Sequence, residues 1–313
     1  MIPPSFVIDL DLLPEQRYAH VINQFNIEKI KVEVNKLYND FLPKIPFINS
    51  VITHIVKSNI SKMMYYDEIL YWSIILNIPF HKIVLLQFIY ELNSACTTFV
   101  TTIKNKRTMY RTMDWHLDLL KYITYTATFI KHRRPIYDAV CWLGAVGIFT
   151  GKNNEYSLAM NYRCLNNITF KSIFHNYTNC MNLFFPASYL IRDTLENNNY
   201  EETKKRLCLT KLISPVYFTI NHFDGVGSII QRTSESFNLI TDETVIQTNC
   251  DNDIDPSNIL FSHERLHQVR SLLNSCDKNK QIRKKLLIEP VINEATVYFC
   301  MMNKTQFKTI VFN

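Results

Sequence analysis

The stretch CTTFVTTIKNKRTMYRTMD, residues 96–114, marks the sharpest change of pattern in this chain of 313 residues. Its first part, residues 96–103, is β-branched or aromatic almost throughout, which is typical of a strand. A polar turn follows at residues 104–107, and a second strand-like run then leads back to Asp114. The stretch therefore predicts a β-hairpin whose first strand begins at Cys96.

The chain before this hairpin has a helical pattern. From residue 26 to residue 92, apolar residues recur at spacings of three and four. The most apolar part, residues 63–92, is interrupted by charged residues and Pro79 before it reaches the roughly 20 residues that a transmembrane helix needs. We expect helices buried against a sheet, or a partly exposed apolar face that reaches lipid, rather than a membrane span.

Strand and helix patterns alternate after the hairpin. Strands are predicted at residues 122–129, 146–150, 156–160, 215–220, 228–232, 244–248, 295–301 and 307–312. Helices are predicted at residues 187–195, 200–209 and 261–274. Helices first, then strands with helices between them, indicate an α+β layered domain.

The composition argues against several classes of protein. With 47% hydrophobic and 20% charged residues, the chain falls among ordinary globular proteins. Its net charge of +6 is spread over short basic clusters, which favours a solvated surface over nucleic-acid binding, with a face toward an anionic membrane as the alternative. The eight cysteines lack CxxC pairs and metal-ligand spacing, so neither a zinc site nor a disulfide framework is predicted.

Several short motifs occur in an order that is known from one family. They are LDLLPEQRY at residues 10–18, CTT at 96–98, RTMD at 111–114, GAVGIFTG at 144–151, YLIR at 189–192, SPVYF at 214–218, QTN at 247–249 and the acidic-Arg pair at 264–265. Each motif is weak alone, but their shared order is specific. Over nearly its whole length the chain resembles the acid ceramidase and N-acylethanolamine-hydrolysing acid amidase family of cysteine N-terminal-nucleophile hydrolases.

This resemblance implies an α+β fold, the αββα sandwich of N-terminal-nucleophile hydrolases, preceded by a helical N-terminal segment. It implies a proenzyme that cuts itself between Ala95 and Cys96. Residues 1–95 would form a helical, α-subunit-like segment and residues 96–313 a β-subunit-like catalytic domain, together one compact unit. The new α-amine, with a reference pKa of about 7.7–8.0, would serve as general base beside the thiol, and no metal or organic cofactor is implied.

The resemblance also assigns roles within the site. Cys96 would be the nucleophile, and Asp114 would accept hydrogen bonds from its new α-amine. Arg111 would hold that carboxylate or the substrate carbonyl, and Asn249 would donate to the oxyanion of the tetrahedral intermediate. The residues implied in substrate binding are Trp115, Tyr162 and Arg163.

Three positions depart from the pattern of the family. Tyr162 stands where the family motif has an acidic residue, which leaves the preferred head group open. Cys250 replaces a tyrosine beside Asn249, and Ala95 replaces a bulkier apolar residue before the nucleophile, which leaves the rate of self-cleavage open.

The expected activity is that of a self-processed lipid amidase, which hydrolyses N-acylethanolamines to fatty acid and ethanolamine through a Cys96 thioester. Ceramide hydrolysis, a homologue that binds lipid amides without turnover, and acyl transfer to an amine are the alternatives. The expected partners are a lipid amide and a peripheral membrane surface, and not nucleic acid. The first residues lack the features of a secretory signal, so the chain as given is expected in the cytoplasm, and a lysosomal or secreted location would require an omitted leader.

Overall fold

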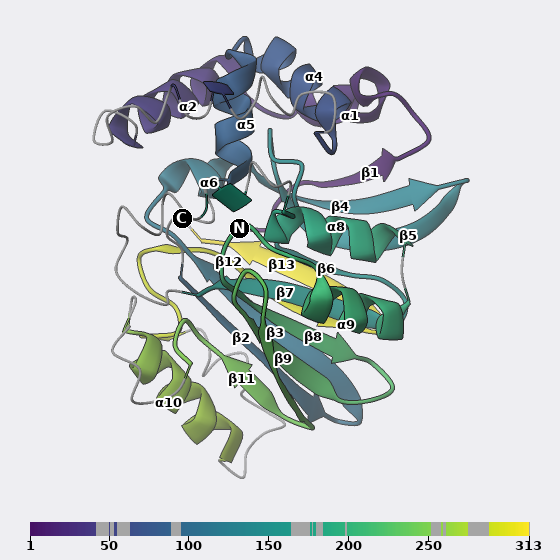
Figure 1. Ribbon diagram of the computed structural model, residues 1–313, viewed down its shortest axis with the longest axis vertical. Helices are drawn as coiled ribbons and strands as arrows, with labels where there is room; N and C mark the ends of the chain where they lie inside the picture. Colours follow the sequence, from purple (N-terminus) through teal and green to yellow (C-terminus); the bar gives the residue numbers. More distant parts are fainter. Residues whose placement is uncertain are drawn as a thin grey trace.

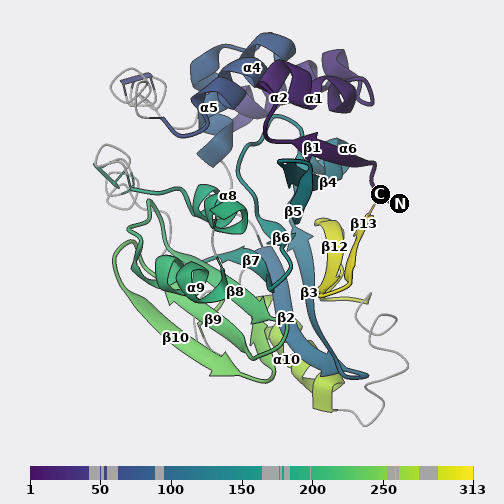
Figure 2. The same ribbon diagram turned by 90° about the vertical axis from the view of Figure 1, so that its right-hand side faces the viewer.

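The computed structural model describes residues 1–41, 63–88, 95–163, 184–197, 199–251, 261–274 and 288–312, with residues 50, 53, 54, 176, 178, 179 and 258 in addition. Two β-sheets lie face to face, and helices cover their outer faces (Figures 1 and 2). A further group of helices from the N-terminal part of the chain lies over one end of the sheets (Figure 1). Both the αββα sandwich and the helical N-terminal segment that we predicted are confirmed.

The larger sheet has eight strands in the order β1-β4-β5-β6-β7-β8-β9-β10. Its strands are β1 (Ser5–Asp9), β4 (Thr124–Lys131), β5 (Arg134–Trp142), β6 (Thr150–Lys152), β7 (Tyr156–Tyr162), β8 (Val216–His222), β9 (Gly227–Arg232) and β10 (Phe237–Asp242). β1 pairs with β4 in parallel, and every later neighbour is antiparallel. The N-terminal segment therefore contributes the edge strand of a sheet that otherwise belongs to the catalytic part of the chain.

The smaller sheet has five strands in the order β11-β2-β3-β12-β13. Its strands are β2 (Ala95–Ile103), β3 (Lys106–Asp114), β11 (Val245–Gln247), β12 (Thr296–Asn303) and β13 (Gln306–Val311). β2 and β3 form the predicted hairpin, whose turn residues Lys104 and Asn105 both have positive φ. This hairpin lies inside the sheet, because β11 and β12 pair with its two outer edges.

The helices fall into three groups. α8 (Ala187–Asn197) and α9 (Tyr200–Leu209) pack on the outer face of the larger sheet, and α10 (Ser262–Asn274) packs on the smaller one (Figure 2). The N-terminal group contains α1 (Pro14–Ile22), α2 (Ile27–Phe41), α4 (Tyr66–Leu76) and α5 (Phe80–Phe88), and the short α6 (Asp118–Ile123) packs against α2. The two ends of the chain lie side by side, since the Met1 amine donates to the Val311 carbonyl at 2.6 Å.

One predicted strand is wrong. Residues 146–149 form no strand, and β6 begins only at Thr150. The backbone of this segment is bound by side chains instead, because the Val146 N–H donates to Gln87 Oε1 at 2.9 Å and the Val146 carbonyl accepts from Arg192 at 3.0 Å. The segment is thus a loop tied to α5 and α8.

Among the described residues, the bent pair of helices α4 and α5 has, taken together, the length and apolar composition of a membrane span. Its two helices meet at an angle of 120°, and no single helix among the described residues is long and apolar enough to cross a membrane. Several of its apolar side chains, such as Ile69, Trp72 and Ile83, are buried against the rest of the protein.

Candidate active site

The hairpin register places Cys96 deep inside the molecule. Cys96 lies opposite Met113, and Ala95 lies opposite Asp114. The Cys96 side chain is completely buried, and its Sγ accepts from Arg111 Nη2 at 3.3 Å. The thiol also lies 3.6 Å from the Met113 sulfur. The predicted nucleophile is therefore held against a guanidinium at the start of a central strand.

Successive side chains of a strand point to opposite faces, and this divides the RTMD motif. Arg111 shares the face of Cys96 and reaches the larger sheet, where its Nη2 donates to the Met160 carbonyl at 2.5 Å. Asp114 points to the other face, toward α10 and β12. The two charges that the sequence brings back near Cys96 thus act from different sides of the sheet.

Arg111 is fixed by the larger sheet. Its Nη1 donates to the Phe149 carbonyl and to Thr150 Oγ1, and Thr150 in turn shares a hydrogen bond with the Tyr298 hydroxyl at 2.7 Å. Several acceptors hold this buried guanidinium, and they fix its orientation toward the Cys96 thiol.

Asp114 is completely buried on the opposite face. The Thr296 hydroxyl donates to its Oδ1 at 2.7 Å, and Arg265 Nη1 lies 3.5 Å from its Oδ2. Burial raises the pKa of Asp114 from its ordinary value of 3.8 to about 6, although Arg265, Thr296 and Arg111 all act in the opposite direction. The carboxyl group therefore changes its charge within the working range of an enzyme.

Asn249 binds the backbone of the nucleophile itself. The Cys96 N–H donates to Asn249 Oδ1 at 2.8 Å, and Arg265 Nη2 donates to the same oxygen at 3.0 Å. On its other side, Asn249 Nδ2 donates to the Tyr162 carbonyl at 2.8 Å. Donors on one side and a carbonyl on the other fix the orientation of this amide. Asn249 is thus positioned at the nitrogen of the Ala95–Cys96 bond.

Two further residues, for which the sequence analysis predicted no functional role, complete the site. Arg265 is completely buried and joins Asp114, Asn249 and, at 2.9 Å, the Thr97 hydroxyl. Asn161 accepts from the Thr98 hydroxyl at 2.7 Å, and its Nδ2 lies 3.4 Å from the Cys96 carbonyl. A signal for Arg265 does exist, because it belongs to the acidic-Arg pair at residues 264–265 and falls on the apolar face of α10 with Val269 and Leu272.

Two of the expected substrate-binding residues, Tyr162 and Arg163, lie at the end of β7, beside Asn249. Arg163 binds Asp251 through two hydrogen bonds, Nε to Oδ1 at 2.9 Å and Nη2 to Oδ2 at 2.6 Å. The Tyr217 hydroxyl donates to the same carboxylate at 2.6 Å. A polar cluster therefore borders the site on this side, and Arg163 is already held by a carboxylate.

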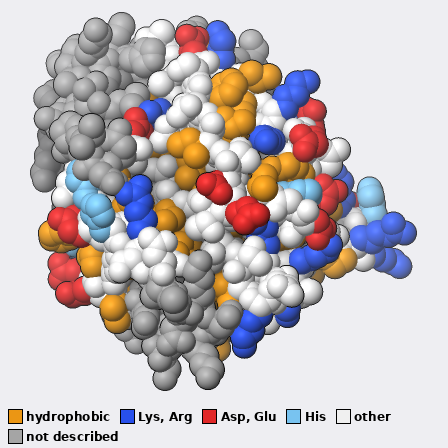
Figure 3. Space-filling model, turned by 90° about the horizontal axis from the view of Figure 1, so that it is seen from below, with side chains coloured by type: hydrophobic (Ala, Val, Ile, Leu, Met, Phe, Trp, Pro, Cys, Tyr) orange, Lys and Arg blue, Asp and Glu red, His pale blue; other side chains and the backbone are white. Residues whose placement is uncertain are grey.

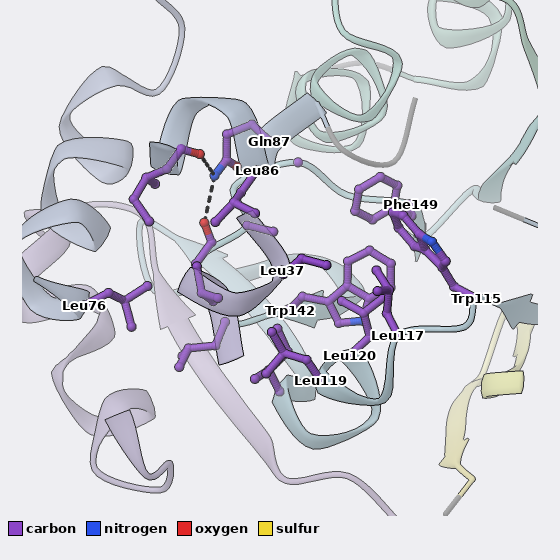
Figure 4. A pocket seen from close by; sticks show the side chains of 17 residues that line it. Leu37, Leu76, Leu86, Gln87, Trp115, Leu117, Leu119, Leu120, Trp142 and Phe149 are labelled. Atoms are coloured by element: carbon purple, nitrogen blue, oxygen red, sulfur yellow. Dashed lines mark hydrogen bonds between the residues drawn. The ribbon is translucent and has the colours of Figure 1, made fainter. Parts of the chain in front are cut away.

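The third, Trp115, lines an apolar pocket under the N-terminal helices. Figure 4 shows Trp115 and Phe149 on one side of this pocket and Leu37, Leu86 and Gln87 on the others. Its two aromatic walls lie next to the candidate site, because Trp115 follows Asp114 and the Phe149 carbonyl binds Arg111. The pocket therefore lies beside the residues that hold Arg111 and follow Asp114.

The described residues contain no group of three or more His, Cys, Asp or Glu that could hold a metal ion. The five cysteines that the structure describes, Cys96, Cys141, Cys208, Cys250 and Cys300, are free thiols. On the face seen in Figure 3, the described basic and acidic side chains are mixed. The described residues around Cys96 bring together a thiol, a carboxyl group, two guanidinium groups and side-chain amides.

A cysteine at the start of an inner strand of an αββα sandwich defines the class of the N-terminal-nucleophile hydrolases. In agreement, the solved structure of the Caenorhabditis elegans N-acylethanolamine-hydrolyzing acid amidase ortholog superposes with a TM-score of 0.60 at 21% identity, covering 70% of this chain and 100% of that one.

Sequence comparisons define the family. The family model for the beta subunit of N-acylethanolamine-hydrolyzing acid amidase matches residues 2–60. An uncharacterized protein of Acanthamoeba polyphaga mimivirus is 31% identical over 97% of this chain and 97% of its own length, and the acid ceramidase of Bos taurus is 26% identical over 98% and 85%. The chain belongs to the N-acylethanolamine-hydrolysing acid amidase and acid ceramidase family. It is a cysteine hydrolase that acts on linear amide bonds.

Proposed function

We propose that the chain cuts itself between Ala95 and Cys96 and then hydrolyses N-acylethanolamines to fatty acid and ethanolamine. The observation that carries this proposal is that two atoms of Cys96, its sulfur and its backbone nitrogen, are each held by a hydrogen bond. Its thiol contacts Arg111, and the nitrogen that would become its α-amine binds Asn249. A buried structural cysteine needs neither contact, whereas a nucleophile that acquires its own base needs both atoms placed.

The cut would proceed by an N-to-S shift. The Cys96 sulfur attacks the Ala95 carbonyl carbon, the C–N bond breaks, and the nitrogen takes up a proton as it becomes an amine. Water then hydrolyses the thioester, which leaves a carboxylate on Ala95 and a free thiol and amine on Cys96. Asn249 holds the departing nitrogen on the side of Arg265, and Asp114 lies opposite Ala95 in the register.

Turnover would use the same atoms. The α-amine takes the thiol proton, the sulfur attacks the carbonyl carbon of the lipid amide, and ethanolamine leaves with a proton from the ammonium group. Water releases the fatty acid from the Cys96 thioester in the second half of the reaction. Hydrogen bonds from buried side chains would stabilise the oxyanion, and Asn249 is the candidate donor.

The apolar pocket supports a long acyl chain as the substrate group. Its lining is almost entirely aliphatic and aromatic, and the side chain of Gln87 is held by Ile83, Gly144 and Val146. We expect Leu120→Trp, which fills this space, to raise the KM for a long-chain amide by about tenfold and to spare a short-chain amide. Equal losses for both chain lengths would argue that the acyl group lies elsewhere.

Ceramide is the second candidate substrate, because an acid ceramidase covers nearly all of this chain at 26% identity. Fatty-acid release from palmitoylethanolamide and from a ceramide, measured in parallel with Cys96→Ala as the control, separates the two. Faster release from palmitoylethanolamide supports the proposal, and faster release from ceramide reverses the order of substrates. Inertness of a correctly cut enzyme toward both would leave a lipid-binding homologue, and release that requires an added amine acceptor would indicate acyl transfer.

A further inference from the structure

Glu68, on α4, lies at the centre of a buried ionic cluster far from the thiol. Only 5% of its surface is exposed. Arg192 donates to both of its oxygens, Nη2 to Oε1 at 2.7 Å and Nη1 to Oε2 at 2.9 Å. Arg17 forms a second ion pair with Oε1, and the Tyr18 hydroxyl donates to Oε2 at 2.7 Å. One carboxylate thus satisfies two guanidinium groups and a phenol.

The members of this cluster come from both sides of the Ala95–Cys96 bond. Arg17, Tyr18 and Glu68 belong to the N-terminal segment, whereas Arg192 belongs to α8 on the larger sheet. Two of the motifs that the catalytic chemistry leaves unused, LDLLPEQRY and YLIR, therefore meet at Glu68. Arg192 extends the contact into the loop before β6 through the Val146 carbonyl at 3.0 Å.

The ion pairs of this cluster require Glu68 to be a charged carboxylate. Burial alone would raise the pKa of Glu68, but Arg192, Arg17 and the Tyr18 hydroxyl outweigh it and hold the pKa below the ordinary value of 4.5. Removing one partner of a buried ion pair is costly, because the other charge is left without compensation in a poorly solvated place.

Residues 1–95 contain no cysteine. After a cut at Cys96, therefore, no disulfide can join the N-terminal segment to the rest of the molecule. The segment would be held by non-covalent contacts alone, of which the described ones include the β1–β4 pairing, the hydrogen bonds of Gln87 and the Glu68 cluster.

We propose that Glu68 is the latch that keeps residues 1–95 on the catalytic domain once the chain is cut. The proposal rests on the self-cleavage proposed above. The latch is a positioning device: it retains the helices that cover the apolar pocket and makes no contact with reacting atoms. Because a lowered pKa gives stability that is present above 4.5 and is lost as the pH falls through the folded-state value, the latch holds at neutral pH and weakens in stronger acid.

The test compares Glu68→Gln with Glu196→Gln in the cut protein. Glu196 is a matched control, because it accepts from the same Arg192 at 2.8 Å but lies in the same helix, so that contact does not cross the cut. Native mass spectrometry and size-exclusion chromatography at pH 7 follow the two pieces during dilution. We expect Glu68→Gln to raise the dissociation constant of the pieces by about 100-fold and Glu196→Gln to change it by less than about tenfold.

The same substitutions in an uncut Cys96→Ala background separate this proposal from the cleavage itself. There, both variants remain one chain, and Glu68→Gln lowers the melting temperature more than Glu196→Gln does. Equal dissociation of the two cut variants, or a cut Glu68→Gln protein that holds together as tightly as wild type, would overturn the latch. An intact mass that shows no cut in the wild-type chain would instead overturn the proposed function and leave the latch nothing to hold.

Discussion

Asp114 lies three positions after Arg111 along β3, and this odd spacing decides which charge meets the thiol. Arg111 lies on the same face of the smaller sheet as Cys96, whereas the Asp114 carboxylate is paired with Arg265 on the opposite face. The sequence contained this information, since side chains alternate along any strand. It did not contain the partner of Asp114, because Arg265 lies 151 residues further along the chain, on α10.

Arg265 is therefore expected to be essential for the stability of the site. Arg265→Ala leaves the Asp114 carboxyl group in a buried place without its ion pair, and should lower the free energy of unfolding by about 3–5 kcal/mol. Urea denaturation of the uncut Cys96→Ala chain measures this without interference from cleavage. The double variant Asp114→Asn/Arg265→Ala is the control and should recover part of the loss. A loss below about 1 kcal/mol would show that the pair contributes little.

The raised pKa of Asp114 predicts that kcat/KM falls on the acid side of its pH profile. If the carboxylate form accepts hydrogen bonds from the α-amine, kcat/KM should fall about tenfold for each pH unit below about 6, because protonation removes that acceptor. The profile of Asp114→Asn should be lower throughout and should lack this fall. An unchanged fall in Asp114→Asn would assign the titration to another group.

At the scale of elements, the patterns that predicted best belong to segments whose pairing is central. After Cys96, β2 is β-branched or aromatic throughout, and both strands of the β2–β3 hairpin are largely buried inside a sheet. The strands that the sequence did not reveal have physical reasons to be hidden: β1 and β10 are short edge strands, β10 is exposed throughout, and β5 contains Pro135 and Asp138. The Asp138 carboxylate is satisfied by the Thr128 hydroxyl at 2.7 Å, a contact that only the fold provides.

The loop before β6 shows the reverse error. Residues 146–150 look like a strand, but the ladder that a strand needs is replaced by Gln87, Arg192 and the Ser188 carbonyl. A side chain from α5, in a different part of the chain, thus overrides a local preference for strand.

Gln87 should accordingly matter more than an ordinary helix residue. Gln87→Met keeps the shape of the side chain but leaves the Val146 N–H and the Gly144 carbonyl without this partner, at a cost of about 1–3 kcal/mol for each buried group. Thermal unfolding of the uncut chain gives the effect, and the comparison is Gln268→Met on the distant α10, which removes a single part-buried hydrogen bond from the Val291 N–H at 3.3 Å. Equal stability of the two variants would mean that water replaces the lost bonds.

At the scale of the whole molecule, the proposed cut separates two parts that build one pocket. Leu37, Leu76 and Leu86 come from the N-terminal segment, whereas Trp142 and Phe149 come from the catalytic part. A dissociated catalytic part would keep Cys96 and lose half of the proposed acyl site. We therefore expect activity on long-chain amides to fall on dilution of the cut Glu68→Gln protein in step with loss of the complex, and a loss of activity without dissociation would contradict this link.

The central claim is that Cys96 becomes an N-terminal nucleophile, and the intact mass of the purified chain after incubation across a range of pH tests it most directly. The account predicts two fragments, one beginning at Met1 and one at Cys96, and a single uncut chain for Cys96→Ala. A wild-type chain that stays whole yet hydrolyses lipid amides, or a cut at any other bond, would contradict it.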